Sequence, residues 1–247
     1  MKAGILLLAC SPALAQLQFD AATVKISKGD TKVAAGYSKS GQFVAPNATL
    51  KDLVILAYGL HESQILGAPS WFDSDRFDIF AKAAPETKFD DVRIMIQSLL
   101  RERFGLAVHI EERTLPAYSL TLAKGGSKLE ASAAAQTGCA PGQSVKWGML
   151  HLTCRMVANS TLAGVLLSIG HGYLEHVPVV DDTGLNGTWD FTLDFTPKPE
   201  FDAGSADHPV VSFFDALQEQ LGLRLDLRKL PLHVLVIDRA DRVPSEN

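Results

Sequence analysis

The chain has 247 residues, of which 47% are hydrophobic and 21% are charged, as in an ordinary globular protein. Its formal net charge of −5, without a Lys/Arg cluster, excludes the concentrated basic surface of nucleic-acid-binding proteins, so we expect no nucleic acid among its partners. No segment approaches the ~18–20 apolar residues of a membrane-spanning helix. We therefore expect a globular protein without a transmembrane segment, folded as one domain or as two small ones.

The first 15 residues have the pattern of a signal peptide. An apolar run over residues 3–9 is followed by a proline and by Ala13-Leu14-Ala15. Small residues at the −3 and −1 positions predict cleavage between Ala15 and Gln16, and hence export to the periplasm or the medium. An alternative is a lipoprotein signal, in which Leu7-Leu8-Ala9-Cys10 is the cleavage box and Cys10 carries the lipid.

The cysteine content agrees with export. Cleavage after Ala15 removes Cys10 and leaves Cys139 and Cys154, an even pair that an oxidising compartment would join as a disulfide. The bridge would close a loop of about 15 residues, which contributes ~3 kcal/mol in the chain-entropy model. The alternative is two unpaired structural thiols, because two cysteines alone do not supply the four ligands that zinc prefers.

Two stretches, Val44–Gly59 and Met156–His171, share one pattern. Each contains Asn, Thr and Leu, and the second set follows the first by 112 positions. Apolar residues then recur at helical spacing in both stretches. Thr49 can cap the first helix, with Asp52 completing a capping box, and Thr161 can cap the second.

Two further similarities follow in the same order. RFDIF at 76–80 resembles TWDFT at 188–192, and LLRERFGL at 99–106 resembles ALQEQLGL at 216–223. The first pair alternates as strands do, and each member of the second pair ends a helix with Gly and continues into an alternating strand. An internal duplication explains the shared order, although common helix and hairpin patterns could coincide by chance.

We therefore predict an α+β fold of two related units, each with the order strand–helix–strand–strand–helix–strand–strand. The sheets should be mainly antiparallel and packed with helices. The predicted boundaries are a signal peptide at 1–15, a first repeat at 16–125, a Gly/Ala/Ser-rich linker at 126–150 and a second repeat at 151–247.

The chain also resembles a family of secreted proteins of unknown function that is abundant in acidobacteria and other soil bacteria. The resemblance covers nearly the whole mature chain. It rests on FDAATVKIS, GQFVAPNATLKDLVILAYG, ILGAPSWFDSDRFDIFAKA, LLRERFGLAVHIEERTLPAYSLTLAKGG, VVDDTGLNGTWDFTLDF and the C-terminal LQEQLGLRLDLRKLPLHVLVIDRADRVPSEN. It implies export but brings no settled activity and no set of catalytic residues. The chain departs from the family at SIGHGYLEHVPVV, where the family tends to have a plain amphipathic helix ending in Gly-Arg-Pro-Val-Val.

This departure contains the densest group of polar residues in the sequence. His171 and Glu175 are four positions apart, and His176, Asp181 and Asp182 follow. Imidazole and carboxylate groups are good ligands for zinc and other transition metals, so these residues are candidates for a divalent metal site and for catalysis. The alternative is a solvated helix end followed by a turn, because the spacing is one residue away from His-x-x-Glu-His. No other cofactor is predicted.

No established catalytic motif is present. The sequence lacks Gly-x-Ser-x-Gly and the Gly-rich phosphate-binding loops, and Ser160 and His151 form no triad that sequence alone would identify. We expect an exported, non-catalytic module that binds a small ligand, a peptide or an envelope protein. The alternative is a small secreted hydrolase of ester or lactone bonds, which a metal at His171, Glu175 and His176 could assist.

Overall fold

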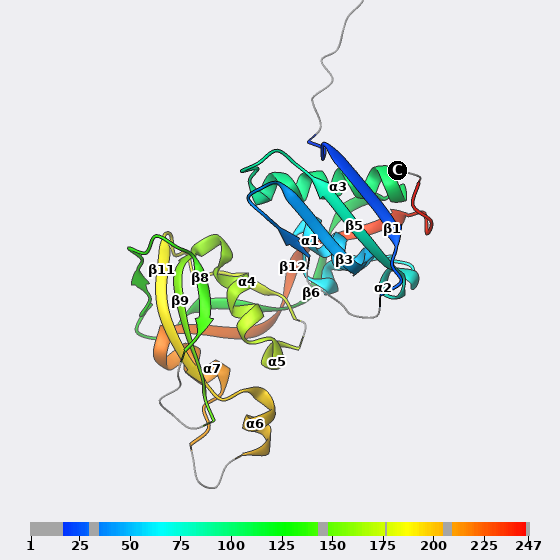
Figure 1. Ribbon diagram of the computed structural model, residues 1–247. Coiled ribbons are helices and arrows are strands. Elements are labelled where there is room, and N and C mark those ends of the chain that lie inside the picture. Colours follow the sequence, from blue (N-terminus) through cyan, green and yellow to red (C-terminus); the bar gives the residue numbers. More distant parts are fainter. Residues whose placement is uncertain (1–16, 30–34, 143–147, 176, 205–208, 246–247) are drawn as a thin grey trace, which may run out of the picture. The chain divides into compact units, whose positions relative to one another are not determined.

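The computed structural model describes residues 17–29, 35–142, 148–175, 177–204 and 209–245 (Figure 1). The predicted cleavage site after Ala15 and the alternative lipid site at Cys10 lie outside these ranges. The described residues form helices and three sheets of four strands each. Most strand pairs are antiparallel, which confirms the predicted α+β class. None of the helices described has the length and apolar character that a membrane crossing requires.

The chain divides into two compact units. One contains residues 1–111 and 234–247, and the other contains residues 112–233. The chain crosses between them within two long strands, β6 (Ala107–Leu122) and β12 (Leu223–Arg239). These strands are neighbours in one sheet, and each gives one end to each unit. The C-terminal strand therefore belongs to both units.

These units differ from the predicted divisions at 16–125, 126–150 and 151–247. Residues 126–150, which we expected to be a linker, contribute β7 (Glu130–Ala131) and β8 (Gly138–Pro141) to a sheet of the second unit. The difference arises because a periodic pattern identifies a strand but not the strand with which it pairs.

The first unit is built on the sheet β1-β5-β3-β2, against which two helices, α1 and α3, pack (Figure 1). Its core is aromatic and aliphatic, with Phe43, Phe77, Phe104 and Ile96 almost completely buried. The short β4 lies beside the end of β12. The bounds are β1 (Ala21–Ile26), β2 (Gly36–Tyr37), β3 (Gln42–Thr49), α1 (Leu50–Tyr58), η1 (Glu62–Gln64), β4 (Ile65–Leu66), α2 (Trp71–Ser74), β5 (Arg76–Lys82) and α3 (Phe89–Phe104).

Helix α1 begins with the predicted capping box. The Thr49 hydroxyl accepts a hydrogen bond from the backbone N–H of Asp52 at 3.0 Å. The Asp52 carboxylate in turn accepts one from the backbone N–H of Thr49 at 3.2 Å. The predicted apolar stripe faces the core, and all four of its members are buried: Leu50, Leu53, Val54 and Ala57. Local pattern and tertiary packing therefore agree at this helix.

The second unit is built on the sheet β7-β11-β9-β8, with helices packed on its apolar face. Helix α4 has Ala158 as its N-cap, so Thr161 lies inside the helix and donates its hydroxyl to the Ala158 carbonyl at 2.9 Å rather than capping the helix. The bounds are β9 (Leu150–Ala158), α4 (Asn159–Ile169), α5 (His171–Leu174), β10 (Val179–Asp181), β11 (Thr188–Phe195), α6 (Lys198–Ala203), α7 (Phe213–Ala216) and the π-helical turn η2 (Leu217–Leu221).

The two units share one unusual backbone feature. Asn47 in β3 and Met156 in β9 both adopt positive φ, 51° and 49°, at irregularities of their sheets. The Asn47 N–H donates to Asp78 Oδ1 at 2.8 Å, and the Met156 N–H donates to Asp190 Oδ1 at 2.8 Å. Asp190 follows Asp78 by the 112 positions that separate the sequence similarities. The internal duplication itself remains a prediction.

Candidate functional site: a polar cavity at the edge of β11

The predicted histidine–glutamate group lies at a short helix end. His171 begins α5 and is exposed, and Glu175 ends the same helix, also exposed, with a φ of 44°. His176 is outside the described residues. Among the residues that the structure does describe, no three His, Cys, Asp or Glu side chains come together as a group that could hold a metal ion.

The two aspartates of the same prediction bind neighbouring protein groups. Asp181 accepts hydrogen bonds from the Asn159 side-chain amide at 2.7 Å and from the N–H and hydroxyl of Thr183 at 2.9 and 2.7 Å. The Asp182 carboxylate accepts the Ser119 hydroxyl at 2.5 Å. Asp181 thus joins the start of α4 to the turn after β10, and Asp182 ties this turn to β6.

The predicted disulfide between Cys139 and Cys154 is present. The two cysteines face each other across the pair formed by β8 and β9. Cys154 is completely buried, whereas Cys139 is exposed on the edge strand. The bridge therefore fastens β8 to the sheet, and a disulfide fits a protein that is exported to an oxidising compartment.

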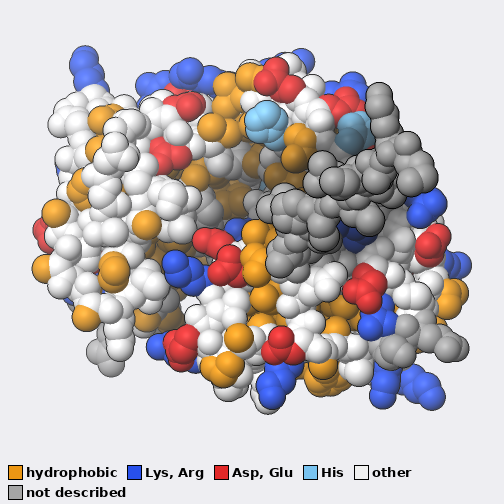
Figure 2. All heavy atoms as spheres, turned by 90° about the horizontal axis from the view of Figure 1, so that it is seen from above, with side chains coloured by type: hydrophobic (Ala, Val, Ile, Leu, Met, Phe, Trp, Pro, Cys, Tyr) orange, Lys and Arg blue, Asp and Glu red, His pale blue; other side chains and the backbone are white. Residues whose placement is uncertain are grey.

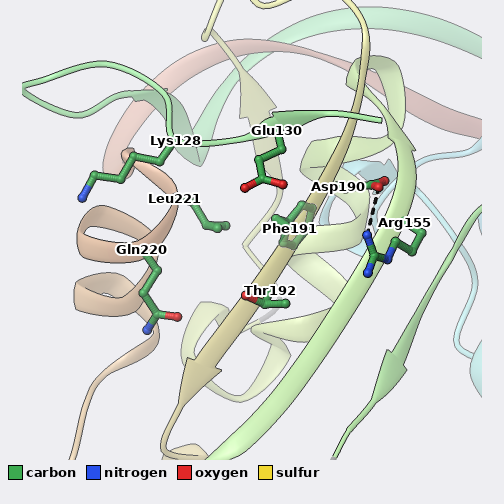
Figure 3. Close-up of a pocket in the computed structure, with 8 residues that line it drawn as sticks. All are labelled: Lys128, Glu130, Arg155, Asp190, Phe191, Thr192, Gln220 and Leu221. Carbon is green, nitrogen blue, oxygen red and sulfur yellow. Dashed lines mark hydrogen bonds and ion pairs between the residues drawn. The ribbon is translucent and has the colours of Figure 1, made fainter. Parts of the chain in front are cut away.

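A cavity of about 260 Å³ opens beside the edge of β11 in the second unit. Figure 3 shows the Glu130 carboxylate pointing into the space between β11 and the turn of helix that carries Gln220 and Leu221. The lining combines charged side chains of both signs with two buried apolar residues, and its members are Lys128, Glu130, Arg155, Asp190, Phe191, Thr192, Gln220 and Leu221.

The cavity lies where the hydrogen-bond ladder on the outer edge of β11 is interrupted. On one side of the gap, Asp190 pairs with Glu130 of β7, and the Ser132 N–H donates to the Thr188 carbonyl at 2.8 Å. The next partner along β7 would be Lys128. Its N–H is instead donated to the Leu221 carbonyl at 2.9 Å, so β7 leaves the sheet before it reaches Thr192.

On the other side of the gap, a side chain takes the place of a strand. The Gln220 amide accepts the Asp194 N–H at 2.9 Å and donates to the Asp194 carbonyl at 2.7 Å. Main-chain groups two residues apart on a strand face the same edge, so the N–H and C=O of Thr192 point toward the cavity as those of Asp194 point toward Gln220. Within the described part of the chain, Thr192 therefore occupies one unfilled rung between two filled ones.

The turn after η2 fixes the position of Lys128. Gly222 has a φ of 64°, and a Cβ atom there would lie 2.0 Å from the Gly126 carbonyl oxygen, so only glycine fits. Because Gly126 and Gly222 approach so closely, Lys128 lies beside η2. There its ammonium donates a hydrogen bond to the Glu219 carbonyl at 2.6 Å. The sequence thus directs β7 away from β11 and leaves the gap.

Asp190 and Arg155 form the one ion pair drawn in Figure 3, at 3.1 Å. Hydrogen bonds from the Ser132 side chain, the Met156 N–H and Arg155 lower the pKa of Asp190 below its ordinary value, so this carboxylate is ionised at neutral pH. On the face shown in Figure 2, acidic and basic side chains are likewise interspersed.

The profile of a family described as a protein of unknown function, DUF3738, matches residues 51–240. The chain belongs to this family. No curated protein and no solved structure matches this chain. The DUF3738 match spans every residue that lines the cavity as well as both cysteines of the disulfide.

The second unit of this chain also forms a row of side chains that sequence reasoning missed. His151 Nδ1 lies 2.8 Å from Asp194 Oδ1, and His151 Nε2 lies 3.5 Å from the Thr153 hydroxyl oxygen. All three are partly exposed, and Gly142 packs so closely over the imidazole that a Cβ there would lie 2.7 Å from its Cδ2 atom. Only the strand register, in which His151 faces Asp194, could have revealed this row.

Proposed function

We propose that this protein is an exported, non-catalytic binding module and that a small polar ligand binds in the cavity beside β11. The observation that carries the proposal is the combination, in one cavity of about 260 Å³, of charged side chains of both signs and an unfilled main-chain rung at Thr192. In ligand sites, a few well-placed polar groups fix the orientation of the ligand and provide specificity.

The lining supports binding rather than catalysis. Among the eight residues around this cavity there is no histidine, cysteine or serine, so its described walls lack the Ser–His and Cys–His pairs of common hydrolases. A cavity of about 210 Å³ in the first unit is a weaker candidate, since its lining begins at Gln18, next to residues that are not described.

The test is a ligand screen that reports on individual residues. The purified mature protein would be titrated with pools of amino acids, short peptides, sugars and organic acids, and the amide resonances would be followed by NMR. We expect at least one pool to shift the resonances of Glu130, Thr192 and Gln220 together. Saturable binding should weaken in Glu130→Gln but not in Glu112→Gln, an exposed acid in β6 outside the cavity. If no pool shifts this group, the proposal is wrong.

The second candidate function is hydrolysis of an ester or lactone, and the row Asp194–His151–Thr153 favours it. The Thr153 oxygen would attack the substrate carbonyl carbon while its proton passes to His151 Nε2, and Asp194 would hold the Nδ1–H of the imidazole. The bond from the carbonyl carbon to the alcohol oxygen would then break as that oxygen takes up the proton; an ester would release its alcohol, whereas a lactone would open and keep it. Water would finally hydrolyse the acyl-threonine ester and restore the Thr153 hydroxyl.

This alternative is tested by the turnover of short-chain acyl esters and acyl lactones, with and without a chelator. Turnover that resists the chelator and disappears in both His151→Ala and Thr153→Val would support the row as a catalytic site. Turnover that the chelator abolishes would point back to a metal near His171 and Glu175. Absence of turnover in a folded protein would exclude these two classes of substrate.

A further inference from the structure

The unfilled rung at Thr192 specifies the chemistry of an occupant. An antiparallel strand pair fills such a rung by exchanging two bonds, in which each residue donates its N–H to the carbonyl of the other. A carboxylate could accept only the Thr192 N–H, and an ammonium could donate only to the Thr192 carbonyl. A residue within an extended peptide supplies both groups, its own N–H and its own carbonyl, with the correct spacing.

The neighbouring rungs limit the length of the occupant that can pair. Glu130 holds the position opposite Asp190, and the Gln220 side chain holds the position opposite Asp194. A long strand therefore cannot be added along β11, and only one residue of an incoming chain can form the two main-chain bonds. The cavity volume of about 260 Å³ is likewise suited to a short segment.

The charged side chains of the cavity indicate which side chain the bound peptide should carry. The Arg155 guanidinium pairs with Asp190 at 3.1 Å, and the Lys128 ammonium donates to a backbone carbonyl at 2.6 Å. Glu130 points into the cavity (Figure 3), and within the described part of the chain its carboxylate forms no ion pair. A cationic group on the ligand would complement this carboxylate.

We propose that the cavity binds a short basic peptide in extended conformation, one residue of which completes the rung at Thr192 while its ammonium group pairs with Glu130. This inference rests on the proposed function, because it names the ligand class for the same cavity. A water molecule at the rung is the competing occupant, and the experiment below separates the two.

The experiment uses the tripeptide Ala-Lys-Ala with a free amino terminus and an amidated carboxyl terminus. Its neutral control is the acetylated peptide with norleucine in place of lysine. A second series replaces each backbone amide in turn by an ester, which removes one N–H donor and keeps the shape. Affinity is measured by calorimetry, and exchange of the Thr192 amide with solvent is measured by NMR.

We expect saturable binding of Ala-Lys-Ala with slower exchange at the Thr192 amide. The neutral peptide, and the basic peptide on Glu130→Gln, should each bind about ten-fold more weakly or worse, as the loss of a charged partner implies. One ester of the series should also bind more weakly than the others. Thr192→Pro would remove the Thr192 N–H donor directly. If that variant does not fold, Glu130→Gln and the ester peptides still test the inference.

The outcomes distinguish this inference from the broader proposal. If another ligand class shifts the Glu130 and Gln220 resonances while the peptide does not bind, the cavity is a binding site but the peptide assignment is wrong. If the peptide binds with unchanged Thr192 exchange and all esters bind equally, the rung is not used and the inference is likewise wrong. If neither the peptide nor any pool reaches the cavity, both proposals are wrong.

Discussion

The closure of the β11 edge by Gln220 can be tested by the variant Gln220→Ala. The substitution removes two hydrogen bonds, to the N–H and to the carbonyl of Asp194. A typical intramolecular hydrogen bond contributes about 0.5–1.5 kcal/mol, so the two together give about 1–3 kcal/mol. Because Gln220 is only partly buried and water can reach the freed groups, we expect a loss of about 1–2 kcal/mol in the free energy of unfolding.

Urea unfolding would measure this loss, and amide hydrogen exchange would localise it. In Gln220→Ala the Asp194 amide should exchange faster, while the amides of buried β11 residues such as Leu193 keep their protection. The matched control is Glu219→Ala, because that side chain is exposed and only its backbone carbonyl binds Lys128, so stability should change by less than about 0.5 kcal/mol. If Gln220→Ala lowers the free energy of unfolding as little as the control does, and the Asp194 amide exchanges at an unchanged rate, Gln220 does not close the β11 edge.

Three other perturbations have defined outcomes. Replacing both Cys139 and Cys154 by Ala should lower the free energy of unfolding by about 3 kcal/mol, and equal urea midpoints with and without the bridge would contradict this. Thr49→Ala should cost about 1 kcal/mol through the lost capping box, which thermal unfolding can measure against Thr161→Ala, a change inside α4 with no cap to lose. The lowered pKa of Asp190 stabilises the fold above the unfolded-state pKa of about 3.9 and ceases to do so as pH falls through the lower folded-state value. Asp190→Asn should therefore be less stable than wild type at pH 7 but lose less stability on acidification, and parallel pH profiles of the two would be inconsistent with this role.

Features decided by neighbouring residues were predictable from the sequence. The stripe of α1 and its capping box follow from spacing alone, because both are properties of one helix. The disulfide followed from an even cysteine count together with an expected export signal, and the α+β class followed from the alternation of helical and strand patterns. In each case, the evidence lay within a short stretch of chain or in a simple count.

Features decided by strand partners were not predictable. The division of β6 and β12 between two units depends on which strands they join, and the cavity depends on β7 leaving β11 before Thr192. Its lining comes from residues between Lys128 and Leu221 that are far apart in the sequence and individually unremarkable. Asp181, a candidate ligand by residue type, instead accepts hydrogen bonds from the neighbouring Thr183 and from the distant Asn159, and a spacing pattern does not reveal such partners.

The central claim is that a short basic peptide binds beside the edge of β11, and photo-crosslinking tests it most directly. Ala-Lys-Ala carrying a photoreactive group at its carboxyl end would be irradiated with the intact mature protein, and the labelled residues would be mapped by mass spectrometry. The account predicts adducts in the segments that contain Glu130, Thr192 and Gln220, which excess unlabelled peptide suppresses and Glu130→Gln diminishes. Adducts confined to other segments, or labelling that excess peptide leaves unchanged, would contradict it.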